Sequence, residues 1–144
     1  MVIPDTQSGK LLKDLTIKTM HENEISYIIR GAIYEVHNHL GPGLFESVYV
    51  KALIRELQTK GLKVHRHVPV PVYYKGLPLE ENFVLDILVE GKVIIEVKSV
   101  EALGKFHHKQ IINYLKLTKH KLGILVNFNT DDLEESIVRK VNGL

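Results

Sequence analysis

The feature that most constrains the fold is a pair of apolar segments with charged residues inside them. Residues 83–89 and 93–97 have the composition of buried strands, and the Glu-Gly-Lys segment at 90–92 between them is typical of an antiparallel hairpin turn. Ionised groups inside buried strands are costly unless they are paired or bind a metal. Asp86 and Glu96 therefore need a partner, either a group of opposite charge or a metal ion.

The loop length decides where these charges lie. A three-residue loop would pair Val89 with Val93. Asp86 would then lie directly opposite Glu96 and project to the same face. Because strand side chains alternate, Glu96 and Lys98 also share a face, so that two carboxylates and one ammonium group converge. A different loop length would put the carboxylates on opposite faces, and a Glu-x-Lys pair alone is more often a solvated salt bridge.

Two neighbouring carboxylates repel each other and require a cation. The chain contains no cysteine, which excludes disulfides, thiolate zinc sites and Fe–S clusters. Oxygen ligands without sulfur suit a hard ion such as Mg²⁺ or Mn²⁺. Such an ion polarises a phosphate oxygen and activates water, and Lys98 would orient that water or stabilise charge developing on the phosphate. The chemistry that this pattern indicates is phosphodiester hydrolysis.

The rest of the chain predicts helices packed on a mixed sheet, an α/β fold. The expected elements are a helix from an N-cap at Asn23 to residue 40, a helix ending before Gly61, an extended stretch at 64–74, strands at 83–89 and 93–97, a crossover helix at 103–118 and a parallel strand at 122–128. Pro69 and Pro71 favour a sheet edge for the extended stretch. The tail at 131–144 is ambiguous, because its acidic start suits a helix whereas 136–141 suits a strand. The predicted order is α-α-β-β-β-α-β plus this tail.

Length and composition predict one domain without an export or membrane segment. Of the 144 residues, 1–22 are interpreted as an N-terminal extension and 23–144 as a single domain. No apolar run approaches the roughly 20 residues that cross a bilayer, and the N-terminus lacks a signal-peptide layout. We therefore expect a cytoplasmic protein. The formal charge of +2 is compatible with nucleic-acid binding but does not require it.

The charged cluster resembles a known signature. Asp86 followed by Glu96-Val97-Lys98 resembles the PD-(D/E)XK nuclease motif, with Leu85 in place of the proline. The resemblance implies that both carboxylates and the Val97 carbonyl bind a divalent metal. It also implies that Lys98 is the catalytic lysine.

Two further motifs extend the resemblance over most of 23–128. Gln110 and Tyr114 resemble the Gln-x-x-x-Tyr motif of RecB-like nucleases, which implies that Gln110 orients the lysine or the water and that Tyr114 faces the nucleic-acid backbone. Residues 43–49, Gly-Leu-Phe-Glu-Ser-Val-Tyr, resemble the signature of the GxxExxY family, which implies Glu46 as an additional metal ligand. Alternative interpretations remain open: a surface glutamine, a core tyrosine and a first-turn glutamate favoured by the helix dipole.

Basic residues give a weaker indication. Lys105, His108 and Lys109, at the start of the crossover helix, suit phosphate contacts, although a solvated face is the more common case. No aromatic-rich stacking platform accompanies them in the sequence. The hypothesis is a metal-dependent nuclease acting on nucleic acid, DNA more than RNA. The alternative is a non-catalytic nucleic-acid-binding or protein-interaction module on the same fold, and a homodimer is a third expectation because small nucleases often need two sites to cut a duplex.

Overall fold

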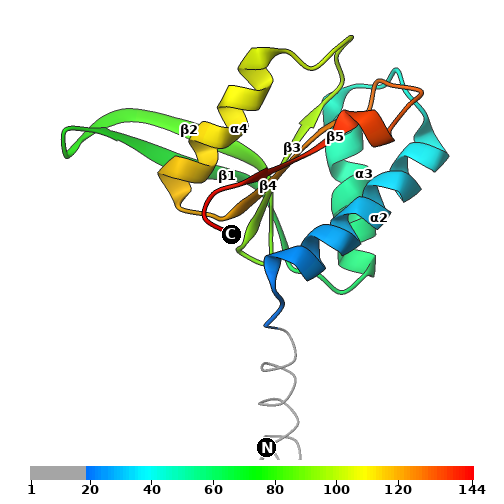
Figure 1. The fold of residues 1–144 in the computed structure, drawn as a ribbon, viewed down its shortest axis with the longest axis horizontal. Coiled ribbons are helices and arrows are strands. Elements are labelled where there is room, and N and C mark those ends of the chain that lie inside the picture. Colours follow the sequence, from blue (N-terminus) through cyan, green and yellow to red (C-terminus); the bar gives the residue numbers. More distant parts are fainter. Residues whose placement is uncertain (1–18) are drawn as a thin grey trace, which may run out of the picture.

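The computed structural model describes residues 19–144, which form a mixed five-stranded sheet with helices on both faces (Figure 1). The elements in chain order are α2 (Glu22–Leu40), α3 (Glu46–Thr59), β1 (Val64–Tyr74), β2 (Leu77–Val89), β3 (Val93–Lys98), α4 (Lys105–Thr118), β4 (Leu122–Asn127), the 3₁₀ helix η1 (Glu134–Ser136) and β5 (Ile137–Val141). The strands follow the order β1-β2-β3-β4-β5, and the β3–β4 pair is parallel whereas the others are antiparallel. The predicted α/β class, the edge position of β1 and the parallel strand after α4 are confirmed.

The two sheet faces are covered by different helices. Alternate residues of β3 and β4, such as Ile95 and Ile124, pack with the buried faces of α2 and α3 in the larger core. On the other face Ile94 packs with Tyr114 and Leu115 of α4. Figure 1 shows α4 on one side of the sheet and the α2–α3 pair on the other. Residues of β3 that share the face of Ile94 therefore point toward α4.

The central hairpin has the loop length on which the site depends. Val89 pairs with Val93, and the pairing continues through Leu88 with Ile94 to Ile87 with Ile95. This is the register that a three-residue loop predicts. The next pair along this register is Asp86 with Glu96.

Several element boundaries differ from the sequence-based expectation. The N-cap of α2 is His21, whose Nδ1 accepts a hydrogen bond from the Asn23 backbone N–H at 3.0 Å, so the assignment of Asn23 as the cap is wrong. The strand β2 begins at Leu77 instead of residue 83, and it pairs with β1 in a long ribbon that extends beyond the sheet (Figure 1). The ambiguous tail forms η1 and then the antiparallel strand β5. Of the predicted extension, residues 1–18 lie outside the described part of the chain, and Glu22 already belongs to α2.

The 43–49 motif builds the loop that leads into α3. The Tyr49 hydroxyl donates to the Gly41 carbonyl at 2.6 Å and accepts from the Leu44 backbone N–H at 3.1 Å. Its ring is fully buried and stacks on Phe128, with centroids 4.5 Å apart. Gly43 has a φ of 94°, which favours glycine. The Ser99 hydroxyl donates to the Leu44 carbonyl at 2.6 Å and so ties this loop to the end of β3.

No helix within residues 19–144 combines the length and the apolar character needed to span a membrane.

Candidate active site

The backbone pairing of β2 and β3 stops after Ile87 and Ile95, and the two strands separate at Asp86 and Glu96. There the two carboxylates, instead of backbone carbonyls, accept hydrogen bonds from backbone N–H groups. The Asp86 Oδ2 atom accepts the Val97 backbone N–H at 2.8 Å. The Glu96 Oε1 atom accepts the Asp86 backbone N–H at 3.2 Å. Each acidic side chain therefore bonds to the backbone of the opposite strand, and the two carboxylates are held beside each other. The convergence expected from the hairpin register is present.

The backbone of Val97 completes a possible set of oxygen donors. In a strand, the N–H and C=O of one residue point to the same side, and successive residues point to opposite sides. The Lys98 carbonyl accepts from Phe128 on the β4 side, and the Val97 N–H points to the β2 side. The Val97 carbonyl therefore points toward the opening beside Asp86. Two carboxylates and one carbonyl are ligands that Mg²⁺ and Mn²⁺ accept, so the donor set fits such an ion.

Burial and like charge make the carboxylate pair a strong acceptor for a proton or a cation. Glu96 is only 2 % exposed. Burial, and next the negative charge of Asp86, raise the pKa of Glu96 from 4.5 to about 8, although the Asp86 backbone N–H and Lys98 lower it in part. At neutral pH the pair thus retains a proton in place of one negative charge. A divalent ion would take the place of that proton.

Lys98 lies on the same face of β3 as Glu96, toward α4, as strand alternation requires. It is half-buried, and its charge is close enough to lower the pKa of Glu96. Within residues 19–144 it forms no direct salt bridge with either carboxylate. The ammonium group is therefore available to a bound anion.

Helix α4 contributes Gln110 and Tyr114, one turn apart on the face that packs against the sheet. Tyr114 is buried, and its pKa is raised by this burial and then by the negative charges of Glu96 and Asp86. The Gln110 side chain lies close enough to the phenol to lower that pKa in part. Its Oε1 atom is fully buried and has no hydrogen-bond partner. Tyr114 is thus a core residue that also faces the carboxylates, and Gln110 is not an ordinary surface glutamine.

Two other predicted residues lie apart from this cluster. Glu46 is the exposed first residue of α3, and no three His, Cys, Asp or Glu side chains among the described residues form a group that could hold a metal. Its role as an additional ligand stays a prediction. His108 lines a different cavity with Glu101 and Glu135, and its pKa is lowered by burial and then by Lys140 and His107. A histidine less protonated than usual is a weaker phosphate contact than the sequence suggested.

The sequence interpretation missed three residues around the site. Asn127, only 3 % exposed, accepts the Val100 backbone N–H at 3.1 Å and donates to the Val100 carbonyl at 2.9 Å, so it fixes the chain that follows β3. A polar residue inside the apolar run at 122–128 was the available signal. Phe83 and Phe106 line a cavity beside Tyr114, together with Lys109. No local pattern connects these aromatic residues, which are distant in sequence.

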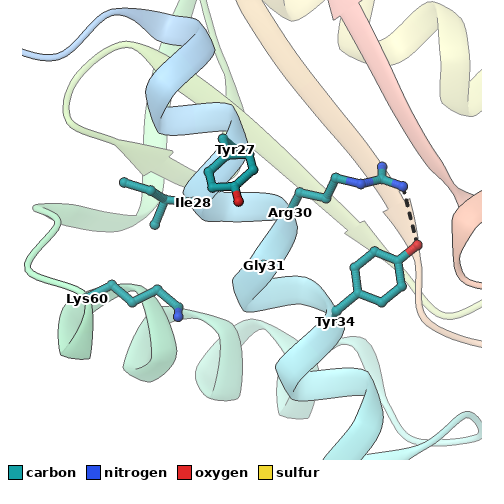
Figure 2. A pocket seen from close by; sticks show the side chains of 6 residues that line it. All are labelled: Tyr27, Ile28, Arg30, Gly31, Tyr34 and Lys60. Atoms are coloured by element: carbon teal, nitrogen blue, oxygen red, sulfur yellow. Dashed lines mark hydrogen bonds between the residues drawn. The ribbon is translucent and has the colours of Figure 1, made fainter.

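A larger cavity lies away from the carboxylates, on the exposed side of α2 (Figure 2). Its volume is about 580 Å³, and its lining consists of Tyr27, Ile28, Arg30, Gly31, Tyr34 and Lys60. Figure 2 shows Arg30 bonded to the Tyr34 hydroxyl, at 3.3 Å. None of the residues predicted for catalysis lies there, so volume alone does not locate the chemistry.

A mixed sheet whose central hairpin directs two carboxylates and a lysine toward one helix defines a restriction-endonuclease-like α/β domain. A family model described as the PD-(D/E)XK nuclease superfamily matches residues 23–140. The chain therefore belongs to the PD-(D/E)XK nuclease superfamily. No curated protein and no solved structure is detectably similar to the chain. The finer assignment to the GxxExxY and Gln-x-x-x-Tyr groups stays a prediction.

Proposed function

We propose that the protein is a metal-dependent nuclease that hydrolyses phosphodiester bonds, in DNA more than RNA. The observation that carries the proposal is the reciprocal bonding of Asp86 and Glu96 across the open ladder, next to Lys98. A structural salt bridge would not need two adjacent carboxylates, one of which has its pKa raised to about 8. A carboxylate whose pKa is raised by burial and by a second carboxylate is typical of a functional site.

Each residue has a role that its position supports. Asp86, Glu96 and the Val97 carbonyl would hold Mg²⁺ or Mn²⁺, which supplies Lewis-acid activation of phosphate and water. Lys98 would stabilise the negative charge that develops on the phosphate. Its half-buried location strengthens this interaction relative to bulk water.

Helix α4 would contact the substrate around the reacting phosphate. The buried Gln110 Oε1 atom, which lacks a partner, would accept a hydrogen bond from water or from the Lys98 ammonium group and so orient it. The Tyr114 hydroxyl would donate a hydrogen bond to a phosphate oxygen. Lys105 and Lys109, exposed on α4 and four residues apart, would contact neighbouring phosphates.

A cleavage assay tests the proposal directly. The purified protein is incubated with single-stranded and duplex DNA and RNA in Mg²⁺, in Mn²⁺ and in EDTA, and calorimetry measures Mn²⁺ binding in parallel. We expect metal-dependent cleavage by the wild type, and loss of both cleavage and Mn²⁺ binding in Asp86→Ala. Nucleic-acid binding without metal binding or cleavage would instead support the non-catalytic module. Scattering mass at the assay concentration tests the expected homodimer.

A further inference from the structure

A further recess lies beside Tyr114, where α4 packs on the sheet. Its volume is about 300 Å³, and it is lined by Phe83, Phe106, Lys109, Gln110, Asn113 and Tyr114. We call it the Phe106 pocket. Five of its six residues lie on α4 at helical spacing, and Phe83 of β2 closes the other side.

Tyr114 belongs both to this pocket and to the carboxylate cluster. Its ring lies 5.2 Å from the Phe83 ring, tilted by 52°. Its phenol is close enough to Glu96 and Asp86 for their negative charges to raise its pKa. A molecule in the pocket would therefore lie next to a phosphate held at the carboxylates.

The lining has the chemistry of a nucleobase site. Phe106 is 72 % exposed and lines the pocket, so its ring is accessible to a ligand there. Gln110 lines the pocket, and the exposed amide of Asn113 adds a donor and an acceptor. Lys109 places a positive charge at the same recess. Aromatic faces, amide groups and one cation match the faces, edges and phosphate of a nucleotide.

We propose that the Phe106 pocket stacks one unpaired nucleobase beside the scissile phosphate, so that the protein acts on single-stranded or unpaired nucleic acid. A volume at the lower end of the roughly 300–1,000 Å³ typical of small-molecule pockets suits a single base. A base inside a duplex is already stacked on both faces and cannot enter without being flipped out. The inference rests on the proposed nuclease function for the position of the phosphate, whereas base stacking itself requires no cleavage.

Equilibrium binding in Ca²⁺, measured by fluorescence anisotropy, tests the pocket without relying on cleavage. The probes are a labelled DNA strand, an RNA strand of the same sequence and the blunt DNA duplex. We expect Phe106→Ala to weaken binding of the single strands by about 5- to 100-fold, which is the effect of losing one stacked base. Phe106→Trp should retain binding. Tyr27→Ala, which removes an equally exposed ring from the distant α2 cavity, is the matched control and should bind as the wild type does.

A strand that carries 2-aminopurine reports stacking independently, because stacking quenches its fluorescence. We expect quenching with the wild type and with Tyr27→Ala, and its loss with Phe106→Ala. Unchanged single-strand binding by Phe106→Ala, or an equal loss for duplex and single strands, would overturn the inference even if the protein cleaves nucleic acid. Phe106-dependent quenching without cleavage in any metal would uphold the pocket and contradict the nuclease. The DNA and RNA probes show which strand the pocket prefers.

Discussion

Asp86 and Glu96 each accept a hydrogen bond from the backbone of the strand that carries the other. This arrangement makes the two carboxylates part of the sheet's own bonding at the point where the β2–β3 ladder ends. Their spacing is therefore set by main-chain geometry instead of by flexible side chains. A site built in this way is preorganised for a cation before any ligand arrives.

The raised pKa of Glu96 predicts that the metal-free protein loses stability as the pH rises. The pKa of this carboxyl rises from its ordinary value of 4.5 to about 8 in the fold, because of burial and the neighbouring Asp86. The folded state thus holds a proton that the unfolded chain releases, so the stabilisation is complete below pH 4.5 and is lost as the pH passes through about 8. Urea unfolding in EDTA should show a free energy of unfolding lower at pH 9 than at pH 5, by on the order of a few kcal/mol.

Glu96→Gln should remove most of this pH dependence, because the amide retains the shape of the side chain but does not titrate. Glu81→Gln, at an exposed position of β2, should keep the wild-type dependence. A Glu96→Gln protein with the same slope as the wild type would show that Glu96 is not the group responsible.

Lys98→Ala should separate catalysis from metal binding. Cleavage should fall by about 10²- to 10³-fold, the effect of removing one group that stabilises transition-state charge. Mn²⁺ affinity should stay the same or rise, because a neighbouring positive charge is removed. Single-turnover cleavage and calorimetry measure the two quantities. The control is Lys51→Ala, which removes an exposed lysine of α3 and should change neither cleavage nor Mn²⁺ affinity. A loss of Mn²⁺ binding in Lys98→Ala, parallel to the loss of cleavage, would contradict a purely catalytic role.

The hairpin pattern was sufficient to predict the carboxylate site because a strand has a fixed two-residue period. Once the loop at 90–92 has three residues, the positions of Asp86 and Glu96 follow. The pocket beside them could not be predicted in this way. Phe83 and Phe106 line one pocket only because α4 takes a particular position and rotation on the sheet. Both are set by tertiary packing, which leaves no local periodic signal.

The 43–49 motif shows a different limit of prediction from sequence. A family resemblance identifies residues that matter without saying why they matter. Tyr49 holds the loop before α3 through two hydrogen bonds and a stacked ring, a structural role. Glu46 in the same motif is exposed, with the position of a first-turn glutamate. The sequence alone could not separate these two roles.

Asn127→Ala should destabilise the protein, because the Asn127 side chain forms three hydrogen bonds to the backbone of Val100 and Asn129. The variant lacks the two hydrogen bonds that the Asn127 side chain forms with Val100. It also lacks the hydrogen bond that the Asn129 backbone N–H donates to the Asn127 Oδ1 atom at 3.2 Å. The part-buried N–H groups of Val100 and Asn129 would lose their partner, at a cost of about 2–4 kcal/mol. Chemical denaturation measures the loss. Asn38→Ala, on the exposed face of α2, should leave stability unchanged or raise it slightly, and an equal loss in both variants would contradict the assigned role.

Gly123→Ala should disturb the packing of α4 against β4. A Cβ atom at this position of β4 would lie 2.8 Å from the Ile111 Cδ1 atom and 3.0 Å from its Cγ1 atom. Ile111 is fully buried, so it can yield only by displacing the helix that carries its neighbour Gln110. The expected loss of stability is about 1–3 kcal/mol. We also expect weaker cleavage, because Gln110 and Tyr114 would shift relative to the carboxylates.

Gly31→Ala provides the matched comparison for Gly123→Ala. Gly31 lies in α2, and a Cβ atom there would meet nothing within 4 Å. Alanine is favoured over glycine inside a helix by about 1 kcal/mol, so this variant should be more stable than the wild type and fully active. Thermal unfolding and the cleavage assay on both variants give the comparison. If Gly123→Ala proved as stable and active as Gly31→Ala, the close packing of α4 against β4 would not be what positions Gln110 and Tyr114 over the carboxylate pair.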